Sequence, residues 1–400
     1  MTHAPAHPPR PLAGLRVIEF SHMVMGPTAG LVLAELGADV IKIEPLGEGD
    51  KTRRLTGSGA GFFVTFNRGK RSLQVDIKSA RGLAVVKRLI ATADIVTENF
   101  RPGALAALGL DYESLKSLNP RLIYASLKGF LSGPYAHRTA LDEVVQMMGG
   151  LAYMTGPPGR PLRAGASVND IMGGMFAAIG VLAALEERHR TGQGRAIKVG
   201  LFETNMLLVA PHMMQYALTG LAAAPMPNRV AAWAIYDVFD TVDASQVFVG
   251  VVSDGQWQAF CDAFGLAEMK ADPALQSNRE RVVQRERFMP QVRELFAQRS
   301  SADILATCER LGLPYAPINR PEDLFDDPHL NHPGAMATLT LPDGRKTSIP
   351  ALPLEVDGAR LGSGHDIPEA GQHSSEIARE LGLHADEVAD LIAAGVIGQA

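Results

Sequence analysis

Strand and helix patterns alternate through the first 130 residues, and this alternation limits the fold more than any other feature. A short apolar strand at Leu15–Phe20 is followed by a helical pattern at Gly26–Leu36 and a second strand at Asp39–Glu44. Strand, helix and strand in such close succession form a βαβ unit, which predicts parallel pairing. The further segments of this kind are strands at Leu73–Ile77, Ile95–Glu98 and Leu122–Leu127, and helices at Ala80–Ala91 and around Gly103–Leu118. We therefore expect an α/β fold with an open, Rossmann-like sheet, whose ligands lie beyond the carboxyl ends of the strands.

A chain of 400 residues favours two domains over one core. Residues 1–12 lack the apolar segment of a signal peptide and are expected to form a flexible tail. Residues 13–220 carry the α/β pattern, and Pro-rich stretches at residues 221–228 and 312–334 are typical of linkers. Between them, residues 229–311 predict a smaller α+β domain with antiparallel strands. Residues 335–400 add short strands and two closing helices.

Bulk composition excludes several classes of protein. The chain has 43 acidic and 38 basic residues, a balance that argues against a general nucleic-acid binder. Its 46% hydrophobic content fits a soluble globular protein, so we expect a cytoplasmic enzyme without a membrane partner. Cys261 and Cys308 show no metal-binding spacing, and no metal site is expected. The loop after the first strand lacks the G-x-G-x-x-G fingerprint of nicotinamide-binding sheets.

One carboxylate stands at the start of an apolar helix. The fifteen residues Ile171–Leu185 contain no charge, which predicts a helix buried on all sides, with Asn169 or Asp170 as its N-cap. A carboxylate at this position can accept helix N–H groups, and we expect these to keep it ionised, as a carboxylate nucleophile must be. Gly173 and Gly174 lack side chains and would let a ligand approach the backbone. The alternative is that Asp170 is only a helix cap.

The run RAGASVNDIMGGMFAAIGVLAALEERHRTGQGRAIKVGLFE, from Arg163 to Glu203, resembles the signature of the class III CoA-transferases. That family contains formyl-CoA and carnitine CoA-transferases and the α-methylacyl-CoA racemases. The resemblance extends from Pro11 to Ile397 and implies that Asp170 is the catalytic aspartate. It also implies a large Rossmann-like domain formed by both chain ends, a smaller inserted α+β domain, and an interlocked homodimer.

Cationic residues in two motifs are candidates for holding the phosphates of coenzyme A. The turn Asn67–Leu73, with the sequence NRGKRSL, is similar to a family turn that lies close to CoA, so the resemblance implies that Asn67, Lys70 and Arg71 bind it. Arg101, in the motif ENFRPG, is a second expected contact. The alternative for each cation is a solvated surface charge. Many relatives have an arginine where this chain has Ala106 and Ala107.

A Gly/Pro loop from Gly129 to Tyr135 also matches the family, except that Leu131 replaces a glycine. It precedes a helix expected to begin near Asp142, which the resemblance implies is a CoA-binding residue. Asp142 is also the fallback candidate for the nucleophile, with an ordinary helix cap as its alternative. Racemases of the family have a histidine just before this acid, where the chain has Leu141. Leucine exchanges no proton, so two-base racemisation is disfavoured.

The resemblance therefore implies CoA transfer from an acyl-CoA to a small carboxylic acid, with CoA thioesters as substrates and no permanently bound cofactor. Asp170 would form a mixed anhydride and then an aspartyl-CoA thioester. Backbone N–H groups near Gly173 and Gly174, or near Gly129 and Gly133, are candidates for stabilising the oxyanions. An acyl-CoA racemase and a CoA-binding protein without catalysis remain alternatives.

The identity of the acid is less constrained. Val24 lies in the expected CoA region where oxalate-using transferases have a glutamine, which disfavours oxalate. A dicarboxylic acyl group is expected on family grounds, and it needs a cation for its remote carboxylate. Arg163, Arg229 and His22 are candidates for that cation, each with a solvated or structural role as its alternative.

Overall fold

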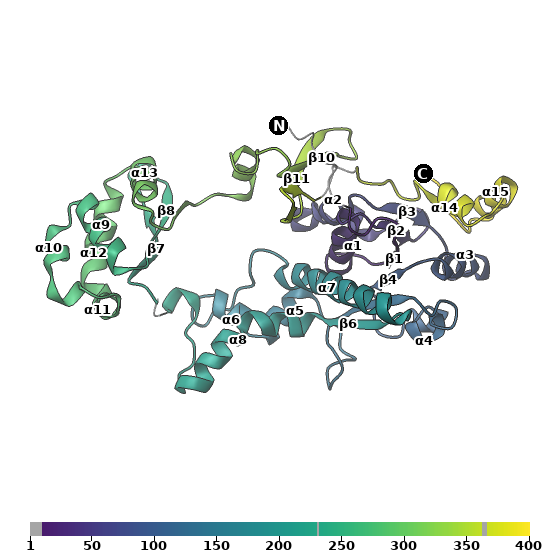
Figure 1. Cartoon of the computed structure of the whole chain (residues 1–400), viewed down its shortest axis with the longest axis horizontal. Coiled ribbons are helices and arrows are strands. Elements are labelled where there is room, and N and C mark those ends of the chain that lie inside the picture. Colours follow the sequence, from purple (N-terminus) through teal and green to yellow (C-terminus); the bar gives the residue numbers. More distant parts are fainter. Residues whose placement is uncertain (1–9, 230–231, 362–365) are drawn as a thin grey trace. The chain divides into compact units, whose positions relative to one another are not determined.

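The computed structural model describes residues 10–229, 232–361 and 366–400 (Figure 1). Its centre is a six-stranded sheet in the order β3-β2-β1-β4-β5-β6, in which every neighbouring pair is parallel. The strands are β1 (Arg16–Phe20), β2 (Asp39–Glu44), β3 (Arg71–Gln74), β4 (Ile95–Glu98), β5 (Ile123–Lys128) and β6 (Ala196–Gly200). The parallel α/β sheet expected from the alternating pattern is confirmed.

Helices connect these strands and cover the sheet. They are α1 (Met25–Glu35), α2 (Phe62–Asn67), α3 (Ala80–Ala91), α4 (Tyr112–Leu115), α5 (Asp142–Met148), α6 (Leu151–Thr155), α7 (Val168–Thr191) and α8 (Leu201–Thr219). The ends of α3 and α7 follow from local sequence. The Ser79 hydroxyl accepts a hydrogen bond from the N–H group of Gly82 at the start of α3. At the end of α7, Gly192 adopts the left-handed conformation of a C-cap.

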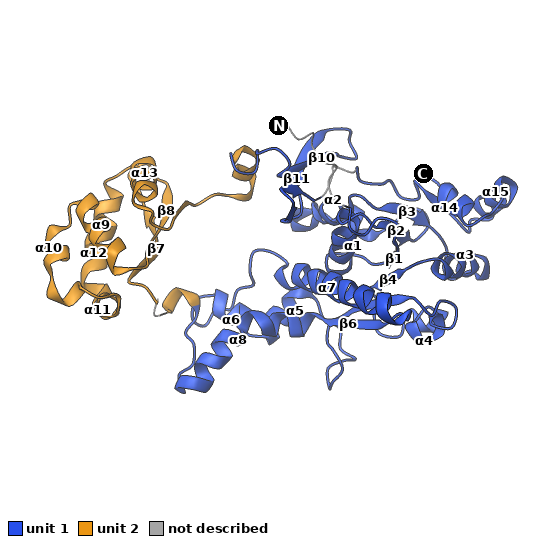
Figure 2. Cartoon of the chain, viewed as in Figure 1, with its two compact units in different colours: residues 1–225, 328–400 blue, residues 226–327 orange. Residues whose placement is uncertain are grey.

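The C-terminal segment packs against the edge strand β3. The His373 N–H group donates to the Ser72 carbonyl, and Ser374 Oγ accepts from the Gln74 N–H group. Helices α14 (Ser374–Glu380) and α15 (Ala385–Ala393) then bury Ile377 and Leu391 in the core that β2 and β3 share. One compact unit therefore combines the chain up to Pro225 with Pro328–Ala400, as Figure 2 shows in blue. Its two-stranded sheets, β10 (Met336–Thr340) with β11 (Lys346–Pro350) and β12 (Glu355–Val356) with β13 (Ala359–Arg360), are antiparallel.

The second unit, Met226–Asp327, has its own core around Trp257, Phe260 and Phe296. It contains β7 (Ile235–Asp240), β8 (Gln246–Val251), β9 (Tyr315–Pro317), α9 (Asp254–Phe264), α10 (Ala267–Ala271), α11 (Asn278–Val283), α12 (Arg285–Ala297) and α13 (Ser301–Leu311). Strand β9 pairs antiparallel with β8. The expected linker at residues 312–334 therefore begins inside this unit. The Pro-rich composition of that stretch concealed a short edge strand, since prolines are tolerated at sheet edges.

Helix α7 is only partly buried, contrary to the expectation from its apolar sequence. Ala177, Ala178 and Val181 lie in the core, whereas Met175 and Ile179 are 47% and 55% exposed. Uniform apolarity hides the face that packs, because both faces carry the same kind of side chain. Among the described residues, α7 is also the helix that is long and apolar enough to cross a bilayer by length and composition. In this structure it packs on α1, β5 and β6.

Candidate active site

The start of α7 is capped by a carboxylate from another helix. Asp142, the first residue of α5, accepts hydrogen bonds at Oδ2 from the N–H groups of Asn169 (2.9 Å) and Asp170 (3.1 Å). The expected N-cap role of Asn169 or Asp170 is therefore wrong. These are the second and third residues of α7, and the residue at the cap position, Ser167, makes no side-chain capping bond. The unpaired N–H groups of the first turn are instead satisfied by Asp142.

Asp142 is buried and held on its other side as well. Its Oδ1 accepts a hydrogen bond from Gln146, one turn along α5. Gln146 Oε1 in turn accepts from the N–H group of Ala164, at 2.8 Å. The two polar side chains of α5 thus fix the segment that leads into α7. Sequence reasoning missed Gln146, because nothing in its local pattern distinguishes it from a surface glutamine.

The Asp170 carboxyl group lies in an unfavourable place for charge. Burial and the neighbouring negative charge of Asp142 raise the pKa of Asp170 to about 7, and the positive charge of Arg163 partly opposes this shift. The sequence predicts that helix N–H groups hold the carboxylate ionised. They do not, because Asp142 accepts from them instead. Asp170 therefore keeps its proton to a higher pH than an ordinary aspartate, a property typical of groups that take part in chemistry.

Asn169, beside Asp170, anchors the helix start in the core. It is fully buried, and its Nδ2 donates to Asn205 Oδ1 at 3.1 Å. Asn205, on α8, donates to the carbonyl of Gly149 at 2.9 Å. This chain of amides ties α7 to α8 and to the end of α5. Asp170 therefore projects from a rigid support, as a reacting group requires.

Gly173 and Gly174 serve helix packing in this structure, and their expected role at a ligand stays a prediction. A Cβ at Gly174 would lie 2.5 Å from the Thr28 Cβ and 2.7 Å from the Met25 carbonyl oxygen, and one at Gly173 would strike the Met25 side chain. Both glycines are buried against α1. Beyond the first turn, helix N–H groups bond to carbonyls four residues back, so these two are not open to an oxyanion.

The Gly129–Gly133 loop keeps a more open environment. Gly133 is exposed, and a Cβ added there would meet no described atom within 4 Å, whereas Gly129 lies against Ala140. The Leu131 N–H group between them already donates to the Glu203 carboxylate, at 3.1 and 3.2 Å. Of the two glycines, Gly133 therefore remains the better candidate for an approach to a ligand.

The two neighbouring cations of the turn Asn67–Leu73, Lys70 and Arg71, lie in different environments. Lys70 is buried, and its Nζ bonds to the Glu19 carboxylate at 2.8 Å, the Pro27 carbonyl at 2.9 Å and Asn67 Oδ1 at 3.1 Å. Burial lowers its pKa to about 8. This geometry leaves no exposed ammonium or amide for a phosphate, so Lys70 and Asn67 are core residues in this structure rather than the expected CoA contacts.

Arg71 begins β3, at the amino edge of the sheet. It pairs there with Asp39, the first residue of β2, at 3.2 Å and with Glu380 of α14 at 2.6 Å. Its pKa is raised, and although burial opposes the rise, hydrogen bonding to Glu380 and the charge of Asp39 prevail. Ligands of open parallel sheets bind at the opposite, carboxyl edge. Arg71 therefore lies at the amino edge of the sheet, whereas a residue that binds the phosphates of CoA is expected at the carboxyl edge.

A hollow of about 540 Å³ lies at that carboxyl edge. Its walls come from the ends of four adjacent strands and include Phe20, Ile43, Val75 and Phe100, and Lys51 and Lys78 also line it. Arg101 follows Phe100 directly and is exposed, and its side chain has no hydrogen bond or ion pair within the described chain. Three acidic residues line it too: Glu44, which pairs with Arg53, Asp50, which pairs with Lys42, and Asp76. Largely apolar walls with a few charged groups are typical of sites for small-molecule ligands.

The loop after β1 joins this hollow to the start of α7. His22 lines the hollow, and its ring lies tilted against that of Phe100, with 5.7 Å between the ring centroids. Both the N–H and the carbonyl of His22 are held by the Asn99 side chain, at 3.1 and 2.9 Å. Two residues later, Val24 is buried in an apolar cluster that includes Ile171, the neighbour of Asp170. Val24 therefore packs between the loop after β1 and the start of α7.

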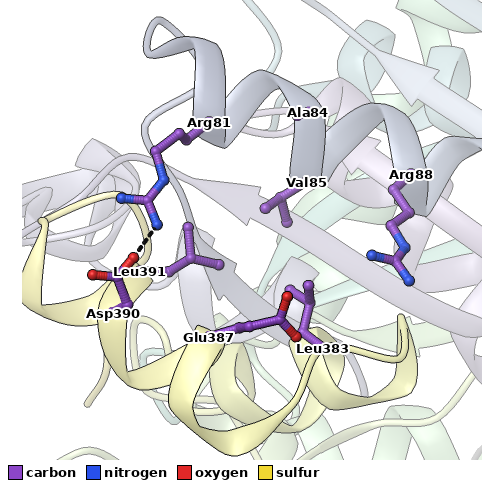
Figure 3. Close-up of a pocket in the computed structure, with 8 residues that line it drawn as sticks. All are labelled: Arg81, Ala84, Val85, Arg88, Leu383, Glu387, Asp390 and Leu391. Carbon is purple, nitrogen blue, oxygen red and sulfur yellow. Dashed lines mark hydrogen bonds and ion pairs between the residues drawn. The ribbon is translucent and has the colours of Figure 1, made fainter.

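A different hollow, of about 370 Å³, lies between α3 and the two C-terminal helices (Figure 3). Its lining includes Arg81, Arg88, Glu387 and Asp390, and Arg81 pairs with Asp390 across it. None of the site residues above lines it. Across residues 10–229, 232–361 and 366–400, no group of three or more His, Cys, Asp or Glu side chains is placed to hold a metal ion.

Comparison with known proteins identifies the class. The model of CoA-transferase family III matches residues 12–374, so the chain belongs to that family. A succinate–glutarate CoA-transferase of Agrobacterium fabrum is 35% identical over 395 residues, which cover 95% of this chain and 98% of the relative. A succinyl-CoA–D-citramalate CoA-transferase of Chloroflexus aurantiacus is 32% identical and covers 98% of this chain and 99% of its own.

The solved structures agree with this assignment. A CAIB/BAIF family protein from Brucella suis superposes with a TM-score of 0.83 at 35% identity, over 94% of this chain and all of that one. Other relatives are named for oxalate and mesaconate, which like succinate, glutarate and citramalate are dicarboxylic acids. The protein is therefore a CoA-transferase that acts on CoA thioesters, as the class name states.

Proposed function

We propose that the protein moves coenzyme A between two dicarboxylic acids by way of Asp170. The observation that carries this proposal is the Asp170 carboxyl group itself, set on a rigid helix start beside the open carboxyl edge of the sheet. Its raised pKa marks a group placed for chemistry. The dicarboxylic acids named for the relatives support the substrate class.

The first half of the cycle unloads the donor. An Asp170 carboxylate oxygen attacks the thioester carbonyl of the donor, the C–S bond breaks, and CoA leaves as a thiolate. The product on the enzyme is a mixed anhydride between Asp170 and the donor acyl group. The thiolate then attacks the aspartyl carbonyl, which releases the donor acid and leaves an aspartyl-CoA thioester.

The second half repeats these steps in reverse with the acceptor. The acceptor carboxylate attacks the aspartyl thioester, expelling the thiolate and forming a new anhydride. The thiolate then attacks the acceptor carbonyl, giving the new CoA ester and restoring the Asp170 carboxylate. One thioester is consumed and one is formed over the whole cycle, so the exchange needs no ATP. Water must be excluded while the anhydride exists.

The test is to incubate the protein with succinyl-CoA and a panel of mono- and dicarboxylic acids and to identify new CoA esters by mass spectrometry. We expect esters of dicarboxylic acids. Solvent deuterium at an α-carbon without exchange of CoA would instead indicate a racemase. Leu141, 61% exposed in front of Asp142, offers no base for that reaction.

The pH dependence of transfer should report Asp170. Only the ionised carboxylate is a nucleophile, so kcat/KM is expected to rise as pH increases through about 7, the raised pKa of Asp170. Asp142→Asn removes the neighbouring negative charge and should move this midpoint to lower pH. Arg163→Met removes the opposing positive charge and should move it higher. A midpoint that neither substitution shifts would assign the titration to another group.

Arg101 and Arg71 form a matched pair for locating the CoA site. Arg101 is exposed at the carboxyl edge, so Arg101→Ala should raise the KM for CoA esters by about 10-fold or more, as expected for a lost charged hydrogen bond. Arg71→Ala, at the amino edge, should leave that KM unchanged. Steady-state kinetics with the acyl-CoA varied provide the measurement. A KM for CoA esters that is raised only by Arg71→Ala would instead place the CoA site at the amino edge of the sheet.

We also propose that a second copy of the chain covers the exposed apolar faces of α7 and α8. Besides Met175 and Ile179, the exposed residues on these two adjacent helices include Leu182, Leu207, Met213, Met214, Tyr216 and Leu218. So large an apolar surface is typical of a protein interface. Light scattering should give twice the mass of one chain. Leu207→Arg with Met214→Arg should lower it, whereas a monomeric native protein would contradict the proposal.

A further inference from the structure

Arg163 is the cation that the structure brings to the candidate nucleophile. It lies in the segment that enters α7, and its charge acts directly on the Asp170 carboxyl group. The side chain is one-third exposed. Its Nε donates to the carbonyl of Ala164 at 3.1 Å, and its Nη1 contacts Glu143 Oε1 at 2.9 Å. The guanidinium is therefore held at the site but remains open to solvent on one side.

One nitrogen of Arg163 is incompletely used. Nη2 forms no hydrogen bond with the described residues, and it lies 3.9 Å from Asp142 Oδ1. That carboxylate oxygen already accepts from Gln146. Nη2 and Nη1 lie side by side on the planar guanidinium, which is the edge that binds a carboxylate with two parallel hydrogen bonds.

Glu143 holds the same edge only weakly. Its side chain is 59% exposed, and exposed ion pairs contribute little because water solvates both charges. A carboxylate delivered by a bound substrate would meet Arg163 in a less solvated place, where the pair is stronger. Glu143 can therefore be displaced at small cost.

The chemistry at Asp170 creates the need for such a partner. One carboxyl group of a dicarboxylic substrate reacts, and the other stays negatively charged close to the buried Asp142. Without a cation, this second charge would be repelled. His22 is poorly suited, because burial lowers its pKa and favours the neutral ring. The Nη1 of Arg229 contacts the Met226 sulfur.

We propose that Arg163 exchanges Glu143 for the distal carboxylate of the substrate and thereby selects dicarboxylic over monocarboxylic acids. This inference rests on the proposed CoA transfer and names the residue that sets its acid specificity. Arg163 also influences the ionisation of Asp170, so its test must separate a contact with the substrate from a general electrostatic effect.

The experiment compares two identity exchanges with acids of equal chain length. Labelled glutarate exchanges into glutaryl-CoA, and labelled valerate exchanges into valeryl-CoA. Each reaction uses one acid class as both donor and acceptor, so the ratio of the two kcat/KM values measures selectivity alone. The variants are Arg163→Met, Glu143→Gln, and Arg160→Met as a control from the exposed part of the same segment.

Assayed at a pH above the titration midpoints of both proteins, where Asp170 is ionised in each, Arg163→Met is expected to lower glutarate exchange by about 10- to 100-fold, the size expected for a lost charged hydrogen bond, with valerate exchange kept. Glu143→Gln should lower the KM for glutarate, and Arg160→Met should change neither exchange. Equal losses for both acids in Arg163→Met would overturn the inference and leave Arg163 as electrostatic support for Asp170. A wild-type protein that exchanges neither acid would instead overturn the proposed function.

Discussion

Replacement of Asp170 by Asn, Ser or Ala is expected to abolish CoA transfer while the protein stays folded. In the proposed cycle Asp170 is bonded covalently to each acyl group in turn, so no neighbour can take over its role. The loss should be on the order of 10⁴- to 10⁶-fold, comparable to removal of other covalent nucleophiles. The helix cap survives in these variants, because Asp142 bonds to the main-chain N–H of residue 170 rather than to its side chain.

Chemical trapping provides the decisive measurement. Protein incubated with acyl-CoA and then with hydroxylamine should carry a hydroxamate at Asp170, because hydroxylamine captures an activated carboxyl group. Asp142→Asn is the matched control: it alters the adjacent carboxylate but should still yield the hydroxamate. Wild-type activity in Asp170→Ser, or trapping at Asp142 instead, would disprove the assignment of the nucleophile.

Lys70→Ala should produce the largest loss of stability among the variants discussed. It removes the ammonium that pairs with the fully buried Glu19 at 2.8 Å and leaves that carboxylate with the more distant Lys42, at 3.5 Å. The Pro27 carbonyl and Asn67 Oδ1 also lose their buried donor. Such a change typically costs about 3–5 kcal/mol of unfolding free energy. Arg71→Ala is the neighbouring control, and it should cost about 1 kcal/mol because its ion pairs are partly solvated.

Urea unfolding of both variants, with acyl-CoA kinetics at low temperature, tests this contrast. We expect Lys70→Ala to lower the unfolding midpoint strongly, with the KM for acyl-CoA nearly unchanged in the folded fraction. The reverse result, a normal midpoint with a raised KM, would restore Lys70 to the CoA site that its sequence motif indicated.

The helices and strands of the parallel sheet could be predicted because each of them is encoded by a local sequence pattern. The secondary structure of the apolar strands, and of amphipathic helices such as Ala80–Ala91, can be predicted from the residues of each segment alone. The short βαβ connections between these segments then favour parallel pairing of the strands. Gly192 and Gly220, each in the left-handed conformation at a helix end, are equally local signals. Asp170 is indicated by a motif rather than by local physics, since its sequence surroundings alone fit an ordinary cap.

Only the tertiary structure decided which residues meet at the site. The cap of α7 comes from Asp142, 28 residues before Asp170, and no local pattern encodes a hydrogen bond across that separation. Lys70 and Arg71 are neighbours with the same charge, yet one lies in the core and the other at the amino edge, because successive side chains of an extended segment point to opposite sides. The periodicity of a sequence predicts whether a residue lies in a helix or a strand. The long-range packing of these elements determines the environment of the residue and therefore its chemistry.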